Sequence, residues 1–282
     1  MMSADDIIHC VRDLPSLPAV VTELLTSLEQ EEFDAHALAA KIMLDQALAA
    51  KTLRLANSSF YGMSTKVTTI QQAISVLGFH SIRTMVTACA VTGGFAPVAG
   101  LAFDFAAFWR HSIASAVCAR VLAPHCRINP DSAFTAGLLH DLGTLVLATR
   151  FPHDYARVAV YRREHDCMTA PAQRAVFGVD HAAVGSALAA HWKFPQPIQA
   201  AVAGHHLADG GLAARAPLTL TSLIYLANIL AHALDLSGQE DDQAPPLALP
   251  VWQALALSEG EGEAVFTQSE QLFNEMCRML TP

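Results

Sequence analysis

Residues 133–144, AFTAGLLHDLGT, form an apolar segment that is followed by a His-Asp pair, and this combination limits the folds open to the chain. Its small and apolar residues predict a helix that ends at His140 and Asp141, just before Gly143. Consecutive residues on a helix point about 100° apart. His140 and Asp141 can therefore converge on one point only where the helix ends, or where other helices bring further ligands to it.

The rest of the chain carries the same helical periodicity, and no segment alternates as a strand does. Asp34 and Asp45 are expected N-caps, and Gly78 is an expected helix stop. The pattern predicts an all-α fold. The expected helices cover residues 14–30, 35–44, 46–57, 67–78, 81–91, 103–122, 130–150, 152–165, 170–177, 181–192, 195–206, 217–234 and 263–280.

The composition is that of a protein with a packed core, and it limits the classes of partner that the chain can bind. Of 282 residues, 52% are hydrophobic and 15% charged, which suffices for a substantial core. The net charge of −9 argues against direct nucleic-acid binding. The N-terminal sequence lacks a signal-peptide pattern, and no uninterrupted apolar run reaches the ~20 residues of a membrane span. We therefore expect a cytoplasmic protein without membrane contact, whose six cysteines are free thiols.

Eight segments together carry a family pattern in order along the chain, and they resemble the HDOD family, the HD-related output domains of bacterial signalling proteins. The resemblance implies a helical N-terminal bundle packed on an HD-like subdomain related to HD and HD-GYP phosphohydrolases. It also implies a regulatory role, often without catalysis, behind receiver or other sensory domains. The segments are LPSLP (14–18), DQALAAKTLRLANSSFYG (45–62), IQQAISVLGFHSIRTMV (70–86), FWRHSIASAVCA (108–119), AFTAGLLHDLG (133–143), FGVDHAAVG (177–185), HWKFPQPI (191–198) and SLIYLANILAH (222–232).

The domain boundaries follow from this resemblance and from two breaks in composition. We predict an HDOD domain over residues 10–235, divided into an N-terminal helical subdomain (10–97) and an HD-like subdomain (98–235). The Gly- and Pro-containing segment 93–100 separates the two subdomains. A linker over 236–249 leads to a C-terminal helical extension over 250–282, which we expect to pack within the molecule. The segment before Leu14 is too short for a receiver domain, so the chain is either a standalone module or the output part of a longer protein.

The resemblance also assigns a possible site for a divalent metal such as Fe, Mn, Zn or Ni, by position in the HD and HD-GYP pattern. Asn228 replaces the last metal-binding Asp, and Thr144 replaces the lysine of HDxGK. The segment 205–212 lacks the GYP sequence. These three losses argue against hydrolysis of cyclic-di-GMP. The ligand candidates are His111, His140, Asp141, His181, His205 and His206.

Structural roles compete with this assignment. His140 and Asp141 could bond to each other and cap a helix, His111 could be a core histidine, and His205 with His206 could cap a helix end. The other histidines, His232 among them, have no partner pattern and are expected to be structural or at the surface. In the N-terminal half, the polar turn after Asn57 is expected to be local capping, with a partner or ligand contact as the alternative.

Two arginines, Arg54 and Arg83, lie in otherwise apolar helices. We expect salt bridges between helices there, with phosphate binding as the alternative. For the whole chain, the first hypothesis is a non-catalytic signalling output module that contacts a signalling partner, such as a receiver or sensor domain. The second is a metal-dependent phosphohydrolase with an altered site, acting on a nucleotide or phosphate ester. The third is a module that binds a nucleotide without catalysis.

Overall fold

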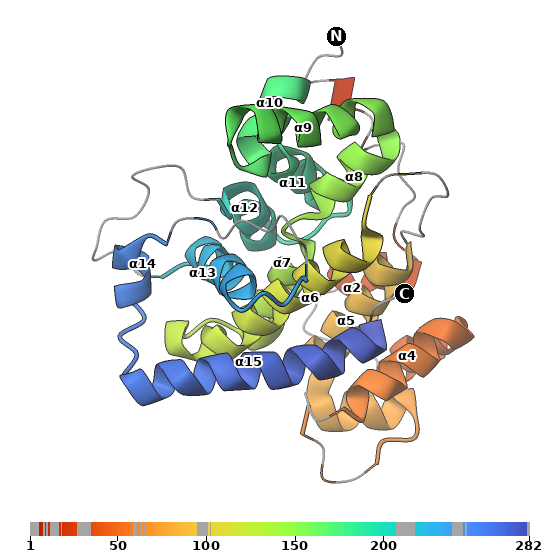
Figure 1. Cartoon of the computed structure of the whole chain (residues 1–282). Coiled ribbons are helices and arrows are strands. Elements are labelled where there is room, and N and C mark those ends of the chain that lie inside the picture. Colours follow the sequence, from red (N-terminus) through yellow and green to blue (C-terminus); the bar gives the residue numbers. More distant parts are fainter. Residues whose placement is uncertain are drawn as a thin grey trace.

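The computed structural model describes residues 6–7, 9, 11, 17, 19–26, 35–58, 61–62, 64, 66–94, 101, 103–206, 218–238, 245 and 247–280. All regular elements in these ranges are helices, so the all-α prediction is confirmed (Figure 1). They are α2 (Ala19–Thr26), α3 (Ala35–Met43), α4 (Gln46–Ala56), α5 (Ile70–Gly94), α6 (Phe105–Leu122), the 3₁₀ turn η3 (Ala123–Cys126), α7 (Pro130–Leu139), α8 (Leu142–Arg150), α9 (Pro152–His165), α10 (Thr169–Phe177), α11 (His181–His191), α12 (Gln196–Gly204), α13 (Leu220–Ala233), α14 (Leu249–Gln253) and α15 (Glu259–Leu280).

Two predicted helix boundaries differ from the structure. The expected helices 67–78 and 81–91 form one helix, α5, which is kinked at Gly78. Gly78 has φ 80°, a conformation that glycine adopts without steric cost, so the residue bends the helix instead of ending it. The expected helix 130–150 is instead two, α7 and α8, which meet at His140 and Asp141. The predicted cap at Asp45 is confirmed, since its side chain accepts a hydrogen bond from Leu48 N at 3.0 Å.

Several predicted features lie outside the described residues. These are the N-cap at Asp34, Ser59 in the polar turn, Cys10, the segment 14–18 except for Leu17, the break at 95–100, the middle of the linker at 239–244, and the segment 207–212. The other five cysteines are free thiols, and Cys89 and Cys118 are buried. The polar turn after α4 is local capping, because Asn57 Nδ2 donates to Leu53 O and Val67 O, and Ser58 Oγ donates to Leu55 O.

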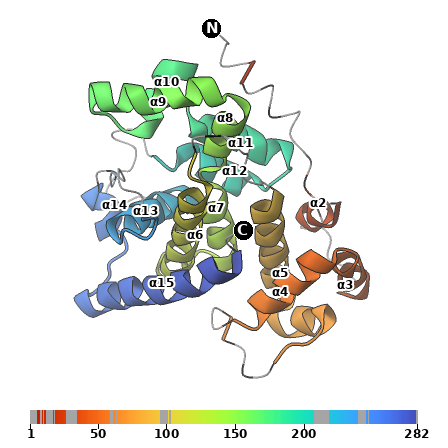
Figure 2. The same ribbon diagram turned by 45° about the vertical axis from the view of Figure 1, so that its right-hand side comes forward.

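The N-terminal bundle, α2 to α5, packs on the HD-like subdomain, α6 to α13, mainly through contacts of α5 with α7 (Figure 2). A polar junction at Asp131 on α7 fixes this contact. Its carboxylate accepts from Arg120 Nη1 at 2.5 Å and from Ser81 Oγ of α5 at 3.1 Å. The Arg120 guanidinium also lies over the Tyr61 ring. The junction joins α5, α6 and α7 at one point.

The helix α6 runs through the centre of the HD-like subdomain, where α7, α13 and α15 cover it (Figure 1). Its side chains are buried almost all round, including those of Trp109, Ile113 and Val117. A helix with no polar face cannot lie at a surface, so α6 forms the core. It also places His111 among buried residues.

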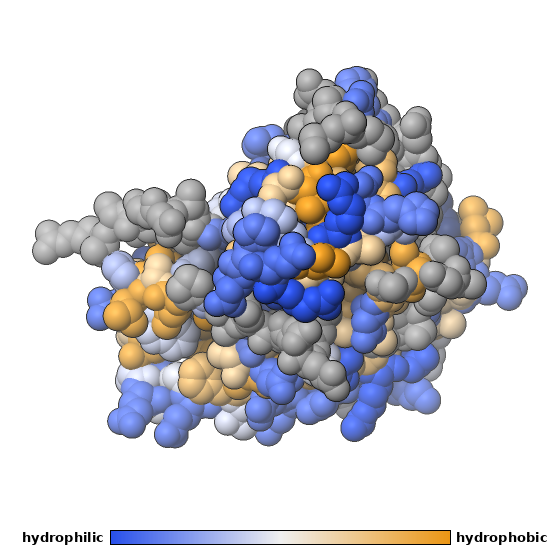
Figure 3. Space-filling view, turned by 45° about the horizontal axis from the view of Figure 1, so that its top comes forward, coloured by the Kyte–Doolittle hydropathy of each residue, from blue (hydrophilic) through white to orange (hydrophobic). Residues whose placement is uncertain are grey.

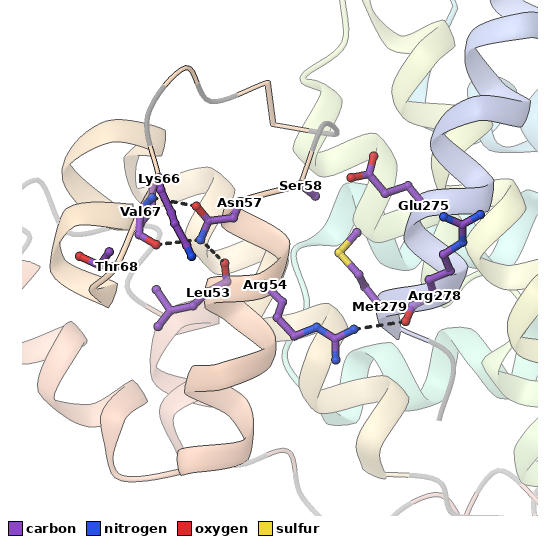
Figure 4. A pocket seen from close by; sticks show the side chains of 10 residues that line it. All are labelled: Leu53, Arg54, Asn57, Ser58, Lys66, Val67, Thr68, Glu275, Arg278 and Met279. Atoms are coloured by element: carbon purple, nitrogen blue, oxygen red, sulfur yellow. Dashed lines mark hydrogen bonds between the residues drawn. The ribbon is translucent and has the colours of Figure 1, made fainter.

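The helix α15 packs across α6 and touches α4 and α5, so the C-terminal extension lies within the molecule as expected. Its buried face includes Val265, Phe273 and Met276. A cavity of about 650 Å³ lies between α4 and α15. Figure 4 shows Arg54 at this cavity, donating to Arg278 O at 3.4 Å. The salt bridges predicted for Arg54 and Arg83 are wrong, since neither has an acidic partner within 4.0 Å among the described residues.

One described segment, Ile70–Thr92 of α5, is long and apolar enough to cross a membrane by length and composition. The sequence criterion of an uninterrupted apolar run missed it, because His80 and Arg83 interrupt the run. Most of the segment is buried against neighbouring helices, as in the core helix of a folded domain. On the face of the molecule shown in Figure 3, hydrophilic residues cover much of the described area, with smaller hydrophobic areas between them.

Candidate metal centre

The structure brings all six candidate ligands to one place, although they come from five helices or helix ends. His111 lies inside α6, and His181 is the first residue of α11. His140 and His205 are the C-caps of α7 and α12, and His206 follows His205. The sixth, Asp141, precedes α8. The end of α7 at the His-Asp pair agrees with the prediction from residues 133–144, though not with the longer helix expected over 130–150, and other helices complete the cluster.

Asp141 lies at the centre of this cluster. Its Oδ2 is 3.4 Å from His140 Nε2 and 3.6 Å from His111 Nε2. Its Oδ1 is 3.1 Å from His181 Nε2 and 3.4 Å from His205 Nε2. Each carboxylate oxygen thus faces a separate pair of histidines. Two groups result, His111–His140–Asp141 and His181–His205–His206, and each has its ligand atoms within 4.8 Å of one another.

The capping alternative for His140 and Asp141 is half right. His140 does cap α7, because its Nδ1 lies 2.6 Å from Gly137 O in the last turn. Asp141 occupies the N-cap position of α8, but its side chain makes no capping hydrogen bond. An N-cap carboxylate normally accepts from the first backbone N–H groups of the helix. Here it is turned toward the histidine rings, which points to a role in the cluster.

Backbone carbonyls fix the orientation of two rings. His140 Nδ1 contacts Gly137 O, and His205 Nδ1 contacts Val202 O at 2.7 Å. A carbonyl can only accept, so Nδ1 must be the donor in both rings. Burial lowers the pKa of His140 to about 3, although Asp141 opposes the shift, so this ring is neutral. Its Nε2 therefore presents a lone pair to the centre of the cluster, as a metal-binding imidazole requires.

Gln173 on α10 orients a third ring. Its Oε1 accepts from the backbone N–H of His181 at 2.9 Å and lies 2.5 Å from His181 Nδ1. Because the backbone N–H can only donate, the amide oxygen must face His181, and Nδ1 must donate to it as well. The other ring nitrogen, His181 Nε2, is then unprotonated and faces the cluster. His206 Nε2 lies 2.7 Å from His181 Nε2, a hydrogen-bond length, so His206 can supply the proton between them.

The hydrogen-bond acceptors of the cluster lie close together. Neutral imidazoles and a carboxylate would lie further apart if no cation were bound between them. Burial raises the pKa of Asp141, but the surrounding histidines outweigh burial and hold it well below its usual range. A negative carboxylate therefore faces the Nε2 lone pairs of three rings, those of His140, His181 and His205, at 3.1–3.4 Å. Two ligands on a tetrahedral ion at about 2.1 Å are separated by about 3.4 Å. The donor set and its spacing fit a divalent metal.

Gly143 explains how α8 comes close enough to α11 for Asp141 to reach His181. A Cβ atom on Gly143 would lie 2.0 Å from His181 O and 2.7 Å from Gly185 N. Only a residue without a side chain permits this approach. The glycine after the His-Asp pair is thus a packing requirement of the cluster.

Two residues beside the six candidate ligands, His232 and Gln173, were not assigned to the site from the sequence. His232 was expected to be structural, but its ring lies 4.4 Å from that of His111. Asn228 lies one turn before His232 on α13, and its buried Oδ1 has no hydrogen-bond partner in the described structure. No motif marks Gln173, because its contact with His181 spans the turn between α10 and α11. The i, i+4 spacing of Asn228 and His232 was the one available signal for His232.

Comparison with known proteins identifies the family. A model of the HDOD domain matches residues 14–208. The chain belongs to the HDOD family. An uncharacterized protein of Treponema pallidum is 24% identical to this HDOD chain over 230 residues, which are 80% of the chain and 43% of that protein. The chain thus corresponds to less than half the length of this curated relative.

Solved structures show the same HDOD fold. A candidate phosphohydrolase from Shewanella amazonensis is 27% identical, with a TM-score of 0.75, and the match covers 99% of this chain and 98% of that one. The MmoQ response regulator from Methylococcus capsulatus is also 27% identical, with a TM-score of 0.50, over 89% of this chain and 98% of that one. The relatives thus include a candidate enzyme and a signalling protein.

Proposed function

We propose that this HDOD chain is a signal-transduction output module that holds a divalent metal in its histidine cluster and acts by contact with a partner protein, without turnover. The observation that carries the metal assignment is the set of imidazoles whose Nδ1 atoms bond to fixed acceptors while their Nε2 atoms converge on Asp141. Fe, Mn, Zn and Ni all accept imidazole with carboxylate.

Missing charges make turnover unfavourable at this site. In HD-type phosphohydrolases a bound metal activates water and neutralises phosphate charge. Asn228 gives this chain a neutral carbonyl where those enzymes have a carboxylate. Thr144 gives it a hydroxyl where HD-GYP enzymes have a lysine for the phosphate. The remaining residues can hold a metal, but they lack the charge that would grip and orient a phosphodiester.

The partner we propose is a receiver or sensor domain, on the same or another chain. The similarity to the MmoQ response regulator supports this choice, because that protein belongs to a signalling system by its name. A metal held by α6, α7, α8, α11 and α12 would fix the relative positions of these helices. The metal would then maintain the surface that the partner contacts.

A metal-dependent phosphohydrolase is the second candidate. The convergence of all six ligand positions favours it, as does the likeness to the Shewanella amazonensis protein. Its substrate would be a nucleotide or a phosphate ester. A nucleotide bound without hydrolysis is compatible with either candidate.

Metal analysis combined with a hydrolysis assay separates the two candidates. We expect purified protein to contain a transition metal in stoichiometric amount, and Asp141→Asn to lose it. Loaded with Mn²⁺, the protein should leave bis-p-nitrophenyl phosphate, p-nitrophenyl phosphate and cyclic-di-GMP unchanged. Hydrolysis that disappears in Asp141→Asn would establish the phosphohydrolase and reject the non-catalytic module. Absence of metal even after incubation with Mn²⁺, Fe²⁺, Zn²⁺ and Ni²⁺ would reject the metal assignment.

A further inference from the structure

A second cavity, of about 320 Å³, lies where α5, α7, α12 and α13 meet, between the N-terminal bundle and the HD-like subdomain. Its volume falls within the ~300–1,000 Å³ typical of small-molecule sites. Exposed His80 and Asn129 contribute to its lining, as do buried Thr87, Thr135 and Ile198. The cavity therefore reaches from the protein surface to buried polar groups.

Arg83 on α5 brings an incompletely bonded cation to this cavity. Its Nη1 is buried and has no hydrogen-bond partner among the described residues. Its guanidinium carbon lies 6.0 Å from the centre of the Phe79 ring, a contact that supplies no acceptor. Burial lowers the pKa of Arg83, and the charge of Asp131 opposes the shift. Asp131 itself is occupied by Arg120 and Ser81.

A second unsatisfied group lies one turn further along the same face of α5. The hydroxyl of Thr87 is buried, lines the cavity and has no hydrogen-bond partner in the described structure. Leaving a buried donor without a hydrogen-bond partner destabilises the folded protein. Two such groups at one cavity indicate a ligand that supplies acceptors to both.

The helix ends around the cavity favour a negative ligand. Asn129 is the N-cap of α7, Pro195 is the N-cap of α12, and Leu220 is the first residue of α13, and all three line the cavity. The N-terminus of a helix carries a partial positive charge. Three helix starts and Arg83 thus bring positive charge to this cavity, in a chain of net charge −9, and Asp131 offsets part of it.

We propose that this cavity binds a small molecule with a phosphate group, with Arg83 and Thr87 donating hydrogen bonds to the phosphate oxygens. Arginine suits this role because its planar fork matches a phosphate. The site is separate from the histidine cluster: α7 and α12 begin at the cavity and end at His140 and His205, about 15 Å away along helix axes. The proposal goes beyond the proposed function and stands whether or not the cluster holds a metal.

Calorimetric titration of the full chain tests the proposal, with inorganic phosphate, pyrophosphate and adenosine monophosphate as probes and chloride at matched ionic strength as the blank. We expect saturable binding of at least one phosphate probe to the wild type. Loss of a charge-assisted hydrogen bond should weaken it by about tenfold or more in Arg83→Gln. Arg163→Gln is the matched control, since it removes the same charge from the exposed face of α9. It should bind as the wild type does.

Melting temperatures without ligand distinguish a binding role from a structural one. Because Arg83 carries an unmade hydrogen bond, Arg83→Gln should melt at or above the wild-type temperature. Thr87→Val, which keeps all charges, should also weaken binding, and it tests the site even if Arg83→Gln does not fold. Failure of all phosphate probes to bind, or binding that is equal in wild type and both variants, would overturn the proposal. Arg83-dependent binding of citrate but not of phosphate would replace the phosphate assignment with a carboxylate.

Discussion

At the scale of single residues, the cluster depends on groups that fix how each imidazole is turned. Gly137 O, Val202 O and Gln173 Oε1 hold the Nδ1 atoms of three rings, so that the opposite nitrogens meet at Asp141. Such outer contacts commonly affect metal affinity by about 10–100-fold. Asn228 is the residue whose chemistry departs most from the enzymes, and it offers a direct test.

Asn228→Asp should strengthen metal binding, because it adds a negative charge one turn from His232, where the buried Asn228 Oδ1 has no hydrogen-bond partner among the described residues. We expect Mn²⁺ affinity to rise roughly tenfold, the scale at which a single group near a metal acts. The metal-free variant should melt lower than the wild type, since the new buried charge has no partner. Titration calorimetry and thermal melting measure both effects. Asn274→Asp, with the same change on the exposed face of α15, is the control, and equal Mn²⁺ affinity in all three proteins would contradict the role of Asn228.

The sequence predicted the members of the histidine cluster better than their surroundings. His111, His140, Asp141, His181, His205 and His206 were selected by position in a family pattern, and the structure places them together. Gln173 and His232 were missed, because their contacts depend on how separate helices pack. The sequence left open that Asp141 bonds to its neighbour His140 and caps a helix, and only the structure shows that its side chain makes no capping hydrogen bond.

At the scale of elements, helix type was predictable, whereas two boundaries were not. Helical periodicity cannot distinguish a helix that ends at Gly78 from one that bends there, nor a continuous helix from α7 and α8 joined at the His-Asp pair. The salt bridges expected for Arg54 and Arg83 were wrong for a related reason. A charged residue in an apolar stretch of sequence shows that a polar contact is needed. It does not show whether a carboxylate, a carbonyl or a ligand supplies that contact.

Gly143→Ala tests the contact between α8 and α11. The added Cβ would meet His181 O at 2.0 Å, so the two helices must separate. We expect a loss of about 1–3 kcal/mol in the free energy of unfolding, the usual cost of overpacking. Metal affinity should fall as well, because Asp141 and His181 belong to the separated helices. Denaturant unfolding and metal titration measure the two effects.

Gly260→Ala in α15 is the matched control for this substitution. Nothing lies within 4 Å of the position of its Cβ, so the variant should be at least as stable as the wild type. Its metal affinity should equal that of the wild type. If Gly143→Ala were as stable as the wild type and bound metal equally well, the close approach of α8 to α11 would not be required for the cluster.

At the scale of the whole molecule, α15 holds the two halves together by lying across α6 while touching α4 and α5. Phe273→Ala should remove a side chain that is 1% exposed and lies under the Arg110 guanidinium. The expected loss is about 3–5 kcal/mol, the range for a buried phenylalanine. Phe266→Ala, at a side chain that is 38% exposed, should cost much less. Denaturant unfolding of both variants compares them, and equal losses would contradict the proposed packing of α15.

In the function we propose, the six converging side chains form a metal centre that this chain retains without the charges needed for turnover. Anomalous diffraction from crystals grown with Mn²⁺, recorded at the manganese edge, tests it most directly. We predict an anomalous peak between Asp141 and the Nε2 atoms of the histidines. Crystals in which only water lies there, with no anomalous signal at saturating Mn²⁺, would contradict the account.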